Sequence, residues 1–354
     1  MQMRVLGRTG LEVSVIGFGG IPIRRPPHDG AVDLYRRGIE LGINYFDCAR
    51  AYVHCEERLA EAVAGVRDEV VISSRDLSHT REEMAEAVDT SLRTLGTDYI
   101  DIYMCHELHQ MSDLDECLAP GGAFEALDGA RDAGKIGFIG MTSHNPDVIM
   151  AGLDTGMMDA VMVMLNYVNR RMVDDVLPRC VKDNVGVGVI KPLGGSLLTS
   201  HADLALRWCL DQQGVHTVPV GMWRPFEVEV NARVGESYQP LSEAELAVLD
   251  ELREVALPDF CMLCYRHHNC PHGVEISRAM IMDLLFTRHG IAEMIEREWD
   301  RDIARIEACF ECEVRQQCAA SCRFGLNIPE ELERIHATYL PVLSRHRDPG
   351  VATG

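Results

Sequence analysis

The chain has 354 residues, of which 47% are hydrophobic, which is enough to bury one large core and a smaller one. Its 55 Asp and Glu against 34 Lys and Arg argue against nucleic-acid binding, because phosphate contacts need a basic face. The first residues lack the pattern of a signal peptide, and no apolar run reaches the roughly 18 residues of a membrane span. We therefore expect a cytoplasmic protein of two domains that binds neither nucleic acid nor membrane.

Short apolar runs alternate with amphipathic segments of helix length, a pattern typical of parallel strands joined by crossover helices. The predicted strands are 13–19, 44–48, 69–74, 99–106, 138–142, 160–166, 185–191 and 217–221. Eight strand and helix pairs predict an α/β protein with a closed (β/α)8 barrel. Ahead of them, residues 4–15 carry Gly7 and Gly10 between two apolar arms, which predicts an N-terminal hairpin that plugs one end of the barrel.

Two helices in this region carry clear boundary signals. Thr80 and Glu83 form a capping box for one helix, and Gly96 is placed to stop it. A helix over 242–255 has its leucines at helical spacing and is followed by Leu-Pro-Asp. We predict that the barrel domain ends there and covers residues 1–256.

Seven of the thirteen cysteines lie between positions 261 and 322, and the spacing Cys-x2-Cys-x5-Cys occurs twice among them. In a reducing compartment, thiols clustered in this way bind metal or an iron–sulfur cluster rather than form disulfides. We predict a small, mainly helical metal-binding module over 257–335 and a C-terminal tail over 336–354. The other six cysteines are predicted to be single, buried small residues.

Reactive side chains stand at the ends of three predicted strands, where the functional residues of such barrels lie. Asp47 and Tyr52 follow the second strand, Arg75 ends the third, and His106 ends the fourth. Each residue taken singly also has a structural interpretation, such as a buried ion pair or an aromatic residue at the edge of the core. Together at matching strand ends, the four predict a catalytic site.

The sequence resembles the aldo-keto reductases from Arg4 to about Val255. The motifs that carry the resemblance are Leu6–Gly10, Asn44–Tyr52, Gly134–Ile136 with Gly140, and Ala205–Trp208. The resemblance implies a TIM barrel that oxidises or reduces a carbonyl or alcohol group of a small molecule. It places the family's tetrad of aspartate, tyrosine, lysine and histidine on Asp47, Tyr52, Arg75 and His106, with arginine in place of lysine.

A carbonyl that accepts hydride develops negative charge on oxygen and needs a proton donor. We expect Tyr52 to be that donor, with its pKa lowered by the Arg75 guanidinium, which Asp47 holds in place, and His106 to orient the carbonyl. Arg75 keeps the charge of lysine but is planar, bulkier and effectively never deprotonated, so the donor geometry or the chemistry differs from the family's.

The resemblance also implies a nicotinamide dinucleotide cofactor. The family's serine, asparagine and glutamine contacts to the carboxamide fall on Ser143, His144 and Met162, so two of the three are changed, and Asn166 is a candidate ligand nearby. Lys191 and the backbone of Gly194 and Gly195 are candidates to cradle the diphosphate. The two glycines have a structural alternative, which is a tight loop.

Residues 221–231 match the family's adenosine-binding turn and helix, where Arg224, Glu227 and Asn231 are candidate ligands. Glu227 stands where an arginine often binds the 2′-phosphate. An acid there repels phosphate and accepts hydrogen bonds from a ribose hydroxyl, which favours NAD(H) over NADP(H). His54 and His144, in loops at the expected mouth of the barrel, are candidate substrate contacts.

The cysteine region resembles the two-cluster ferredoxin module at the C-terminus of one branch of the aldo-keto reductases, with altered spacing. Cross-ligation as in that module assigns one [4Fe–4S] cluster to Cys270, Cys309, Cys312 and Cys318. It leaves a second site with Cys261, Cys264, Cys322 and either His267 or His268. Zinc is the alternative metal, because tetrahedral thiolate sites also use Cys-x2-Cys pairs.

Three functions are compatible with these patterns. The first is a carbonyl or alcohol oxidoreductase with Tyr52 as acid or base, a nicotinamide cofactor and an electron-transfer partner for the iron–sulfur module. The second is a barrel that no longer uses nicotinamide and performs cluster-linked electron transfer, isomerisation or elimination. The departures from the family pattern at Arg75, Met162 and Glu227 suggest it. The third is a non-enzymatic redox or metal sensor.

Overall fold

The computed structural model describes residues 1–257, 260–265, 270–283, 286, 290–291, 294–295 and 299–347. Two compact units are present, the first made of residues 1–194 and 199–249 and the second of residues 195–198 and 250–354. Each unit has a hydrophobic core of its own. His267 and His268, two of the predicted metal ligands, lie outside the described residues.

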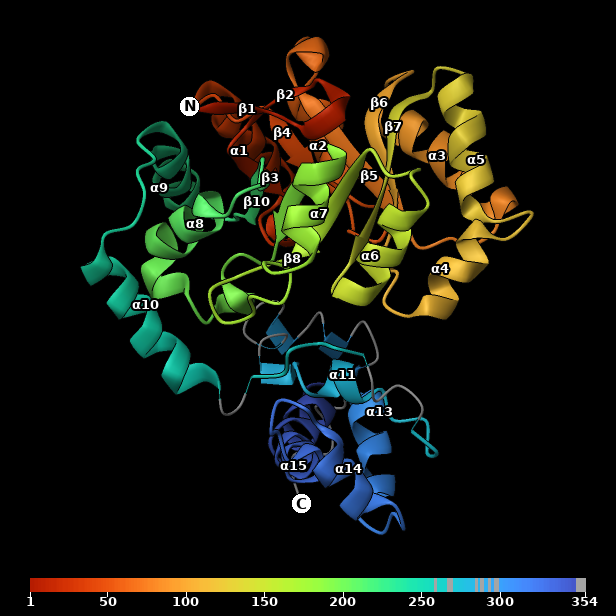
Figure 1. The fold of residues 1–354 in the computed structure, drawn as a ribbon, viewed down its shortest axis with the longest axis vertical. Coiled ribbons are helices and arrows are strands. Elements are labelled where there is room, and N and C mark those ends of the chain that lie inside the picture. The colour runs from red at the N-terminus through yellow and green to blue at the C-terminus, as the bar shows by residue number, and fades with distance from the viewer. Residues whose placement is uncertain are drawn as a thin grey trace. The chain divides into compact units, whose positions relative to one another are not determined.

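The first unit contains one eight-stranded sheet with the strand order β10-β3-β4-β5-β6-β7-β8-β9 (Figure 1). All seven neighbouring pairs are parallel, and an isolated parallel bridge between Gly188 and Thr217 links the two outermost strands. The eight predicted strands and their near-closure into a barrel are therefore confirmed. The strands are β3 (Ile16–Gly19), β4 (Tyr45–Asp47), β5 (Val71–Asp76), β6 (Ile100–Cys105), β7 (Ile136–Ser143), β8 (Ala160–Met164), β9 (Gly186–Ile190) and β10 (Val218–Gly221).

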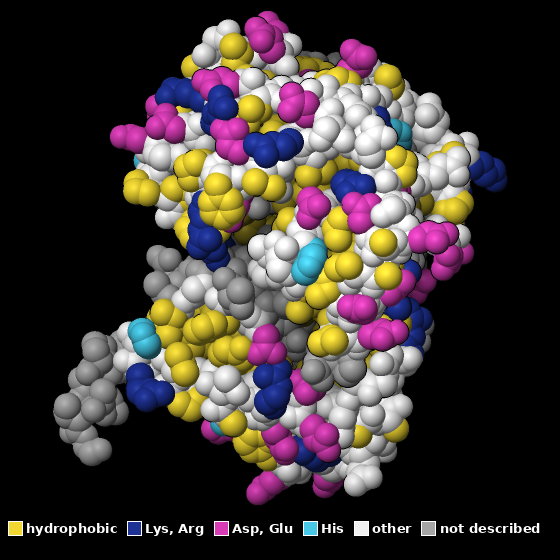
Figure 2. Space-filling model, turned by 90° about the vertical axis from the view of Figure 1, so that its left-hand side faces the viewer, with side chains coloured by type: hydrophobic (Ala, Val, Ile, Leu, Met, Phe, Trp, Pro, Cys, Tyr) yellow, Lys and Arg dark blue, Asp and Glu magenta, His cyan; other side chains and the backbone are white. Residues whose placement is uncertain are grey.

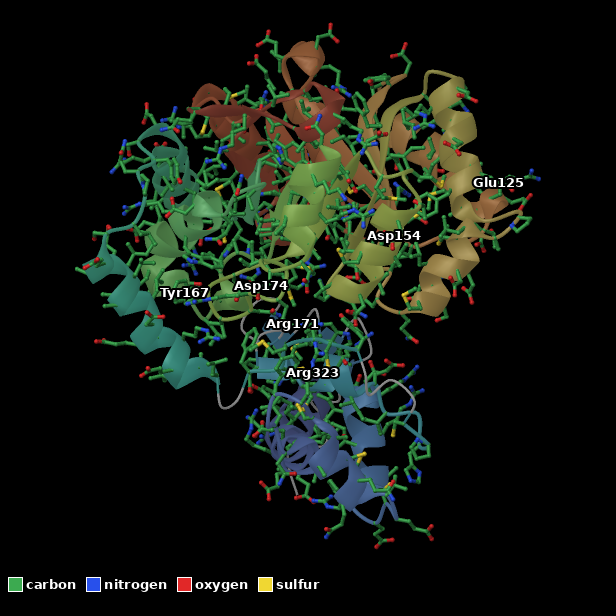
Figure 3. The ribbon with its side chains drawn as sticks, viewed as in Figure 1. Glu125, Asp154, Tyr167, Arg171, Asp174 and Arg323 are labelled. Atoms are coloured by element: carbon green, nitrogen blue, oxygen red, sulfur yellow. The ribbon has the colours of Figure 1, made fainter. Side chains whose placement is uncertain are left out.

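Amphipathic helices join successive strands and cover the outside of the sheet (Figure 1). Their apolar side faces inward: on α5, Phe124 and Leu127 are buried, whereas Glu125 lies on the outer side (Figure 3). The helices of this unit are α1 (His28–Glu40), α2 (Cys55–Ala62), α3 (Arg81–Leu95), α4 (Met111–Leu118), α5 (Ala123–Asp132), α6 (Pro146–Asp154), α7 (Val176–Asp183), α8 (Ala202–Asp211), α9 (Pro225–Glu236) and α10 (Glu243–Ala256).

Helix α3 begins and ends at the predicted signals. The Thr80 hydroxyl oxygen accepts a hydrogen bond from the Glu83 amide at 3.3 Å, which satisfies one of the amides at the start of the helix. Gly96 ends the helix with a φ of 65°, a left-handed conformation that costs glycine no steric penalty. Both boundaries are therefore set by local sequence.

An antiparallel hairpin, β1 (Met3–Val5) with β2 (Glu12–Ser14), closes the amino-terminal end of the barrel. Leu6 and Val13 belong to a buried cluster inside the barrel, together with Ala160, the first residue of β8. Gly7 approaches the chain so closely that a Cβ there would lie 2.4 Å from the amide nitrogen of Gly186. The predicted plug is present, and the opposite, carboxyl-terminal end of the strands is the end that carries the candidate site.

Helix α10 is attached to the barrel through an aromatic pair. Tyr167, in the loop after β8, packs edge-on against Trp208 of α8 at a centroid distance of 5.2 Å (Figure 3). Its hydroxyl donates a hydrogen bond of 3.4 Å to the carbonyl of Leu246 in α10. The predicted helix is thus present, and its residues up to Leu249 belong to the first unit, whereas the chain from Asp250 on belongs to the second.

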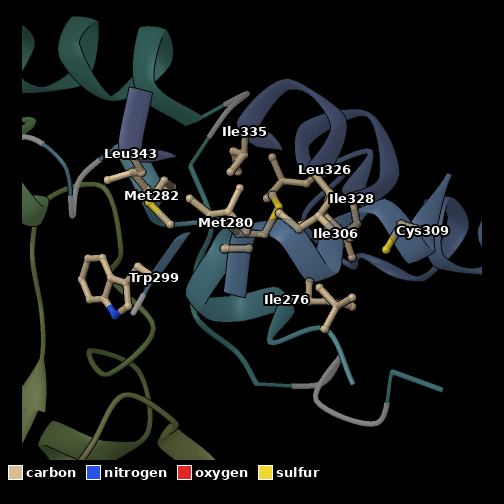
Figure 4. Packing of buried hydrophobic residues seen from close by; sticks show 14 of the residues in the cluster. Ile276, Met280, Met282, Trp299, Ile306, Cys309, Leu326, Ile328, Ile335 and Leu343 are labelled. Atoms are coloured by element: carbon tan, nitrogen blue, oxygen red, sulfur yellow. The ribbon is translucent and has the colours of Figure 1, made fainter. Parts of the chain in front are cut away.

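The described part of the second unit is mainly helical. Its core contains Ile276, Met280, Trp299, Ile306, Leu326, Ile335 and Leu343 (Figure 4). Its elements are α11 (Ile276–Ala279), α13 (Trp299–Ala304), η7 (Arg305–Cys309), α14 (Arg315–Ser321) and α15 (Ile328–Arg347). Residues 336–347, predicted to belong to a tail, are helical because Ile335 and Leu343 pack into this core from one face of α15.

Candidate active site

The four residues of the predicted tetrad come together at the carboxyl end of the strands. Both terminal nitrogens of Arg75 donate to the two carboxylate oxygens of Asp47, at 2.5 and 2.7 Å. One of these nitrogens also donates to the Tyr52 hydroxyl at 2.9 Å. The rings of Tyr52 and His106 meet edge to face, with their centroids 5.6 Å apart. A phenol, an imidazole and a guanidinium–carboxylate pair therefore share one site.

The loop that carries Tyr52 is fixed by backbone hydrogen bonds to β5. The Cys48 amide donates to the carbonyl of Ser73 at 2.8 Å, and the Arg50 amide donates to the carbonyl of Arg75 at 3.0 Å. The Tyr52 amide then closes a turn on the carbonyl of Ala49 at 3.0 Å. Because these bonds extend the parallel ladder beyond β4, they place the phenol beside the guanidinium.

The ion pair between Asp47 and Arg75 is buried, with Arg75 only 1% exposed. Burial alone would lower the pKa of Arg75, but the Asp47 carboxylate and the Tyr52 hydroxyl hold it well above its usual range. Arg75 is therefore charged at every pH at which the protein is folded. A pair of this kind is stable only while both partners are present.

The pKa of Tyr52 is raised, so the expectation of a net lowering is wrong, although Arg75 itself acts in the predicted direction. Burial of the phenol is the largest cause, and the nearby Asp47 carboxylate also raises the pKa. The Arg75 guanidinium, which is bound by both oxygens of Asp47, lowers the pKa of Tyr52, but burial of the phenol outweighs it. Tyr52 consequently keeps its proton at neutral pH.

His106 is a neutral imidazole. Burial lowers its pKa well below the usual value, and the cations Arg75 and Lys191 lower it further. Its Nδ1 atom is buried and has no hydrogen-bond partner among the described residues. A neutral, buried imidazole beside the Tyr52 ring is suited to orient a carbonyl oxygen.

Two candidate cofactor residues lie beside the tetrad, at the end of β7. The Ser143 hydroxyl oxygen accepts the Asn145 amide at 2.9 Å, which leaves the hydroxyl hydrogen available to a ligand. His144 stacks on His109 at a centroid distance of 4.4 Å, and its Nε2 atom lies 2.8 Å from the Lys191 ammonium. His109 was not among the predicted residues, although its place three positions after His106 is a readable signal.

Four other residues named in the cofactor prediction make contacts within the barrel. The Asn166 side-chain oxygen accepts the amides of Val168 and Asn169 at 3.1 and 2.8 Å, and its nitrogen donates to the carbonyl of Lys191 at 3.2 Å. Gly194 donates its amide to the same carbonyl at 3.0 Å, as expected of a tight loop, and Gly195 has a φ of 72°. Met162 is buried in the cluster that contains the plug, away from the mouth.

The candidates for the adenosine end of a dinucleotide lie at the start of α9. The Glu227 carboxylate accepts the amides of Trp223 and Arg224 at 2.8 and 3.1 Å, so it caps the helix. The Arg224 guanidinium lies 4.0 Å from the centre of the Trp223 ring, and the Arg25 guanidinium lies 4.9 Å from it. Asn231 is buried on the same helix. His54, in a left-handed conformation, is exposed just before α2.

All thirteen cysteines are among the described residues, and none of them forms a disulfide. The six in the barrel are buried, as predicted, but they are not all single: the sulfurs of Cys48 and Cys55 lie 3.1 Å apart. In the part of the chain that the structure describes, no group of three or more His, Cys, Asp or Glu side chains is arranged to hold a metal ion.

Four cysteines of the second unit nevertheless lie near one another. The pKa of the Cys309 thiol is raised to about 11, first by burial and then by the thiols of Cys270, Cys312 and Cys318. Burial also raises the pKa of Cys318, and the thiols of Cys270 and Cys312 add to this. Mutual effects of this kind require short separations. These are the same four cysteines that cross-ligation assigns to one cluster.

On the face of the molecule shown in Figure 2, acidic and basic side chains are interspersed and do not form a patch of one sign. None of the helices in the described ranges is long and apolar enough to span a bilayer.

Comparisons with known proteins agree with this architecture. L-galactose dehydrogenase from Arabidopsis thaliana is 27% identical over 314 residues, which cover 73% of this chain and 97% of that protein. The aldo-keto reductase AKR11C1 from Bacillus halodurans, in its holo form, superposes with a TM-score of 0.64 at 25% identity and covers 76% of this chain and 100% of its own.

An aldo/keto reductase from Klebsiella pneumoniae in complex with NADP and acetate superposes with a TM-score of 0.61 at 25% identity. The match covers 71% of this chain and 95% of that one. The sequence profile of the aldo/keto reductase family matches residues 15–203, which is more than half of the chain. The chain belongs to the aldo/keto reductase family.

Proposed function

We propose that this oxidoreductase transfers hydride between a nicotinamide dinucleotide and a carbonyl or alcohol carbon of a small molecule, with Tyr52 as the proton donor and acceptor. The observation that carries the proposal is the hydrogen bond of 2.9 Å between the Tyr52 hydroxyl and Arg75, beside the neutral ring of His106. Related proteins of the same family are bound to NADP or NADPH.

The donor groups at the end of β7 fit a nicotinamide carboxamide. Ser143 has a hydroxyl hydrogen to donate, and the Lys191 ammonium beside His144 is a second donor to the amide oxygen. When bound, the reduced cofactor supplies the hydride that adds to the carbonyl carbon. Glu227 places a carboxylate at the start of α9 that would repel a 2′-phosphate, which favours NAD(H) over NADP(H) even though the guanidinium groups of Arg224 and Arg25 lie at the same helix end.

The residues of the tetrad carry out the proton transfer. As the carbonyl oxygen becomes negative, the Tyr52 O–H bond breaks and the proton moves to that oxygen, which completes the alcohol. Tyr52 is then a phenolate that accepts the hydrogen bond from Arg75, and a proton from water restores it. His106 holds the carbonyl oxygen within reach of the phenol. Because the raised pKa of Tyr52 keeps the phenol protonated, the site favours reduction at neutral pH.

The test is the replacement Tyr52→Phe, assayed by the absorbance of NADH and NADPH with a panel of aldehydes, ketones and sugars. We expect kcat/KM to fall by roughly 10² to 10⁴, which is the usual contribution of a positioned acid. Tyr99→Phe is the matched control, because Tyr99 is exposed. Unchanged turnover in Tyr52→Phe would exclude the role of this phenol. If neither NAD(H) nor NADP(H) binds in a calorimetric titration, the result would favour a barrel that works without nicotinamide.

We further propose that Cys270, Cys309, Cys312 and Cys318 bind one [4Fe–4S] cluster that exchanges electrons with a partner. Support comes from their mutual electrostatic influence and from the preference of iron–sulfur clusters for four thiolates. Cys261, Cys264 and Cys322 are the remaining thiols for a second centre.

Iron and acid-labile sulfide are measured on protein purified without oxygen. Cys312→Ser should lose both and Cys180→Ser neither, whereas a colourless protein rich in zinc contradicts the proposal.

A further inference from the structure

Two buried thiols flank the loop that carries Tyr52. Cys48 directly follows β4, Cys55 is the first residue of α2, and both are fully buried. Their sulfur atoms lie 3.1 Å apart, and both thiols are free. A disulfide bond is about 2.05 Å long, so the two sulfurs would have to approach by only about 1 Å to form one.

The surroundings hold the two sulfurs against each other. A Cβ at Gly20 would lie 2.3 Å from the Cys55 sulfur, so this sulfur fills the space that the missing side chain leaves. The Tyr35 hydroxyl of α1 lies 3.3 Å from the same sulfur. On the other side, the Cys48 amide donates to the carbonyl of Ser73 in β5 at 2.8 Å. The contact between the thiols is therefore built into the packing of three elements of the barrel.

Of the two residues, Cys55 is better placed to react as a thiolate. The pKa of Cys48 is raised well above its usual value, first by burial and then by the neighbouring Cys55. Burial also raises the pKa of Tyr35 well above its usual value, so this phenol keeps its proton and can donate it to the Cys55 sulfur. A hydrogen-bond donor and a position at the start of a helix both favour a thiolate.

We propose that hydrogen peroxide oxidises Cys48 and Cys55 to a reversible disulfide that slows turnover by displacing Tyr52. The Cys55 thiolate attacks one peroxide oxygen, the O–O bond breaks, and Cys55 becomes a sulfenic acid while hydroxide leaves. The Cys48 sulfur then attacks the Cys55 sulfur, and the Cys48 proton leaves with the sulfenic hydroxyl as water. Peroxide accepts two electrons in all, and dithiothreitol returns them by thiol–disulfide exchange. Peroxide is small and uncharged, and the loop that it must pass is at the surface, where Val53 is 51% exposed.

The new bond acts on Tyr52 through the start of α2. Because the Cys48 amide is tied to β5, the approach of about 1 Å falls mainly on Cys55. The Cys55 amide donates to the Tyr52 carbonyl at 2.9 Å, so the loop moves with it and the hydrogen bond from Arg75 to the Tyr52 hydroxyl is strained. A misplacement of about 1 Å can cost about 100-fold in rate. This effect on turnover rests on the proposed function, whereas formation of the disulfide does not.

The first experiment detects the disulfide without any substrate. The full-length protein, purified without oxygen, is treated with hydrogen peroxide, denatured, alkylated with iodoacetamide and digested with trypsin, which separates the two cysteines by cleavage after Arg50. The inference expects mass spectrometry to find the peptides of Cys48 and Cys55 linked, and to find them separate after dithiothreitol. No linkage, or linkage among other cysteines only, overturns it.

The second experiment measures NADH-dependent carbonyl reduction before peroxide, after peroxide and after dithiothreitol. We expect kcat/KM of the wild type to fall by roughly 10- to 100-fold and to recover on reduction. Cys48→Ala and Cys55→Ala, each checked for an unfolding midpoint, should lack this reversible loss. Cys180→Ala is the matched control, because Cys180 is a buried cysteine of α7, and it should behave like the wild type.

The comparison also separates this pair from the cysteines of the second unit. Any oxidation of those cysteines affects the wild type and the three variants alike, so it cannot produce a difference between them. An equal reversible loss in Cys48→Ala and wild type overturns the inference, and so does a linked pair with unchanged turnover. If no carbonyl compound is reduced at all, the proposed function fails, while the peptide linkage still decides whether the disulfide forms.

Discussion

The variant Arg75→Met should be less stable to unfolding than the wild type, because it leaves the Asp47 carboxylate buried without its cation. Both groups are at most 4% exposed, and Arg75 makes two hydrogen bonds to Asp47. Breaking such a pair costs about 3–5 kcal/mol of folding free energy. With a urea dependence of about 3 kcal/mol per M for a barrel of this size, the unfolding midpoint should fall by roughly 1–1.7 M.

The double variant Asp47→Leu with Arg75→Met separates the lost pairing from lost packing. Both charges are gone, so the midpoint should return close to that of the wild type, while the carbonyl reductase activity stays lost. Arg81→Met is the control, since among the described residues the exposed Arg81 side chain pairs only with the exposed Glu82 and Glu125 carboxylates, at 3.0 and 3.8 Å, and its loss should not shift the midpoint measurably. Far-ultraviolet circular dichroism in urea follows the transition. A double variant no more stable than Arg75→Met would refute the reasoning.

Three further predictions concern the proton donor, the plug and its glycine. Because the pKa of Tyr52 is raised, kcat/KM for reduction should stay level through neutral pH and fall only above about pH 10, and a fall near pH 8 contradicts this. Leu6→Ala should cost about 2–5 kcal/mol in denaturant unfolding and leave kcat/KM unchanged, because the plug is at the opposite end of the barrel from the tetrad. Gly7→Ala should lower the free energy of unfolding by more than about 1 kcal/mol, since Gly7 has a φ of +51° and an added Cβ would meet Gly186. An unfolding midpoint like that of the wild type would contradict this close approach.

Much of the barrel was predictable because each strand is a short apolar run, and three of these runs lead into Asp47, Arg75 and His106. The tetrad followed from the same pattern, since the register of parallel strands brings Asp47, Arg75 and His106 to one end. The shift of the Tyr52 pKa was not predictable. It depends on the balance between burial and a guanidinium bound by both oxygens of Asp47, and only the folded geometry fixes that balance.

Other features were hidden for identifiable reasons. The contact of Lys191 with His144 joins residues that follow different strands, and the left-handed backbone of Lys191 has no sequence signal. The contact between Cys48 and Cys55 depends on the path of the loop between them. The capping role of Glu227, three residues after Arg224, was readable from spacing alone. Pro341 and mixed charge obscured the continuation of α15.

The filled interior of the barrel has a consequence for how its specificity is able to change. Leu6 and Val13 occupy the lumen from below, so a ligand is accommodated by the connections above the strands and not by the lumen. Those connections can be lengthened or exchanged without disturbing the hydrogen-bonded ladder. New substrate preferences can therefore arise by grafting segments at the rim while the phenol and its guanidinium stay where they are.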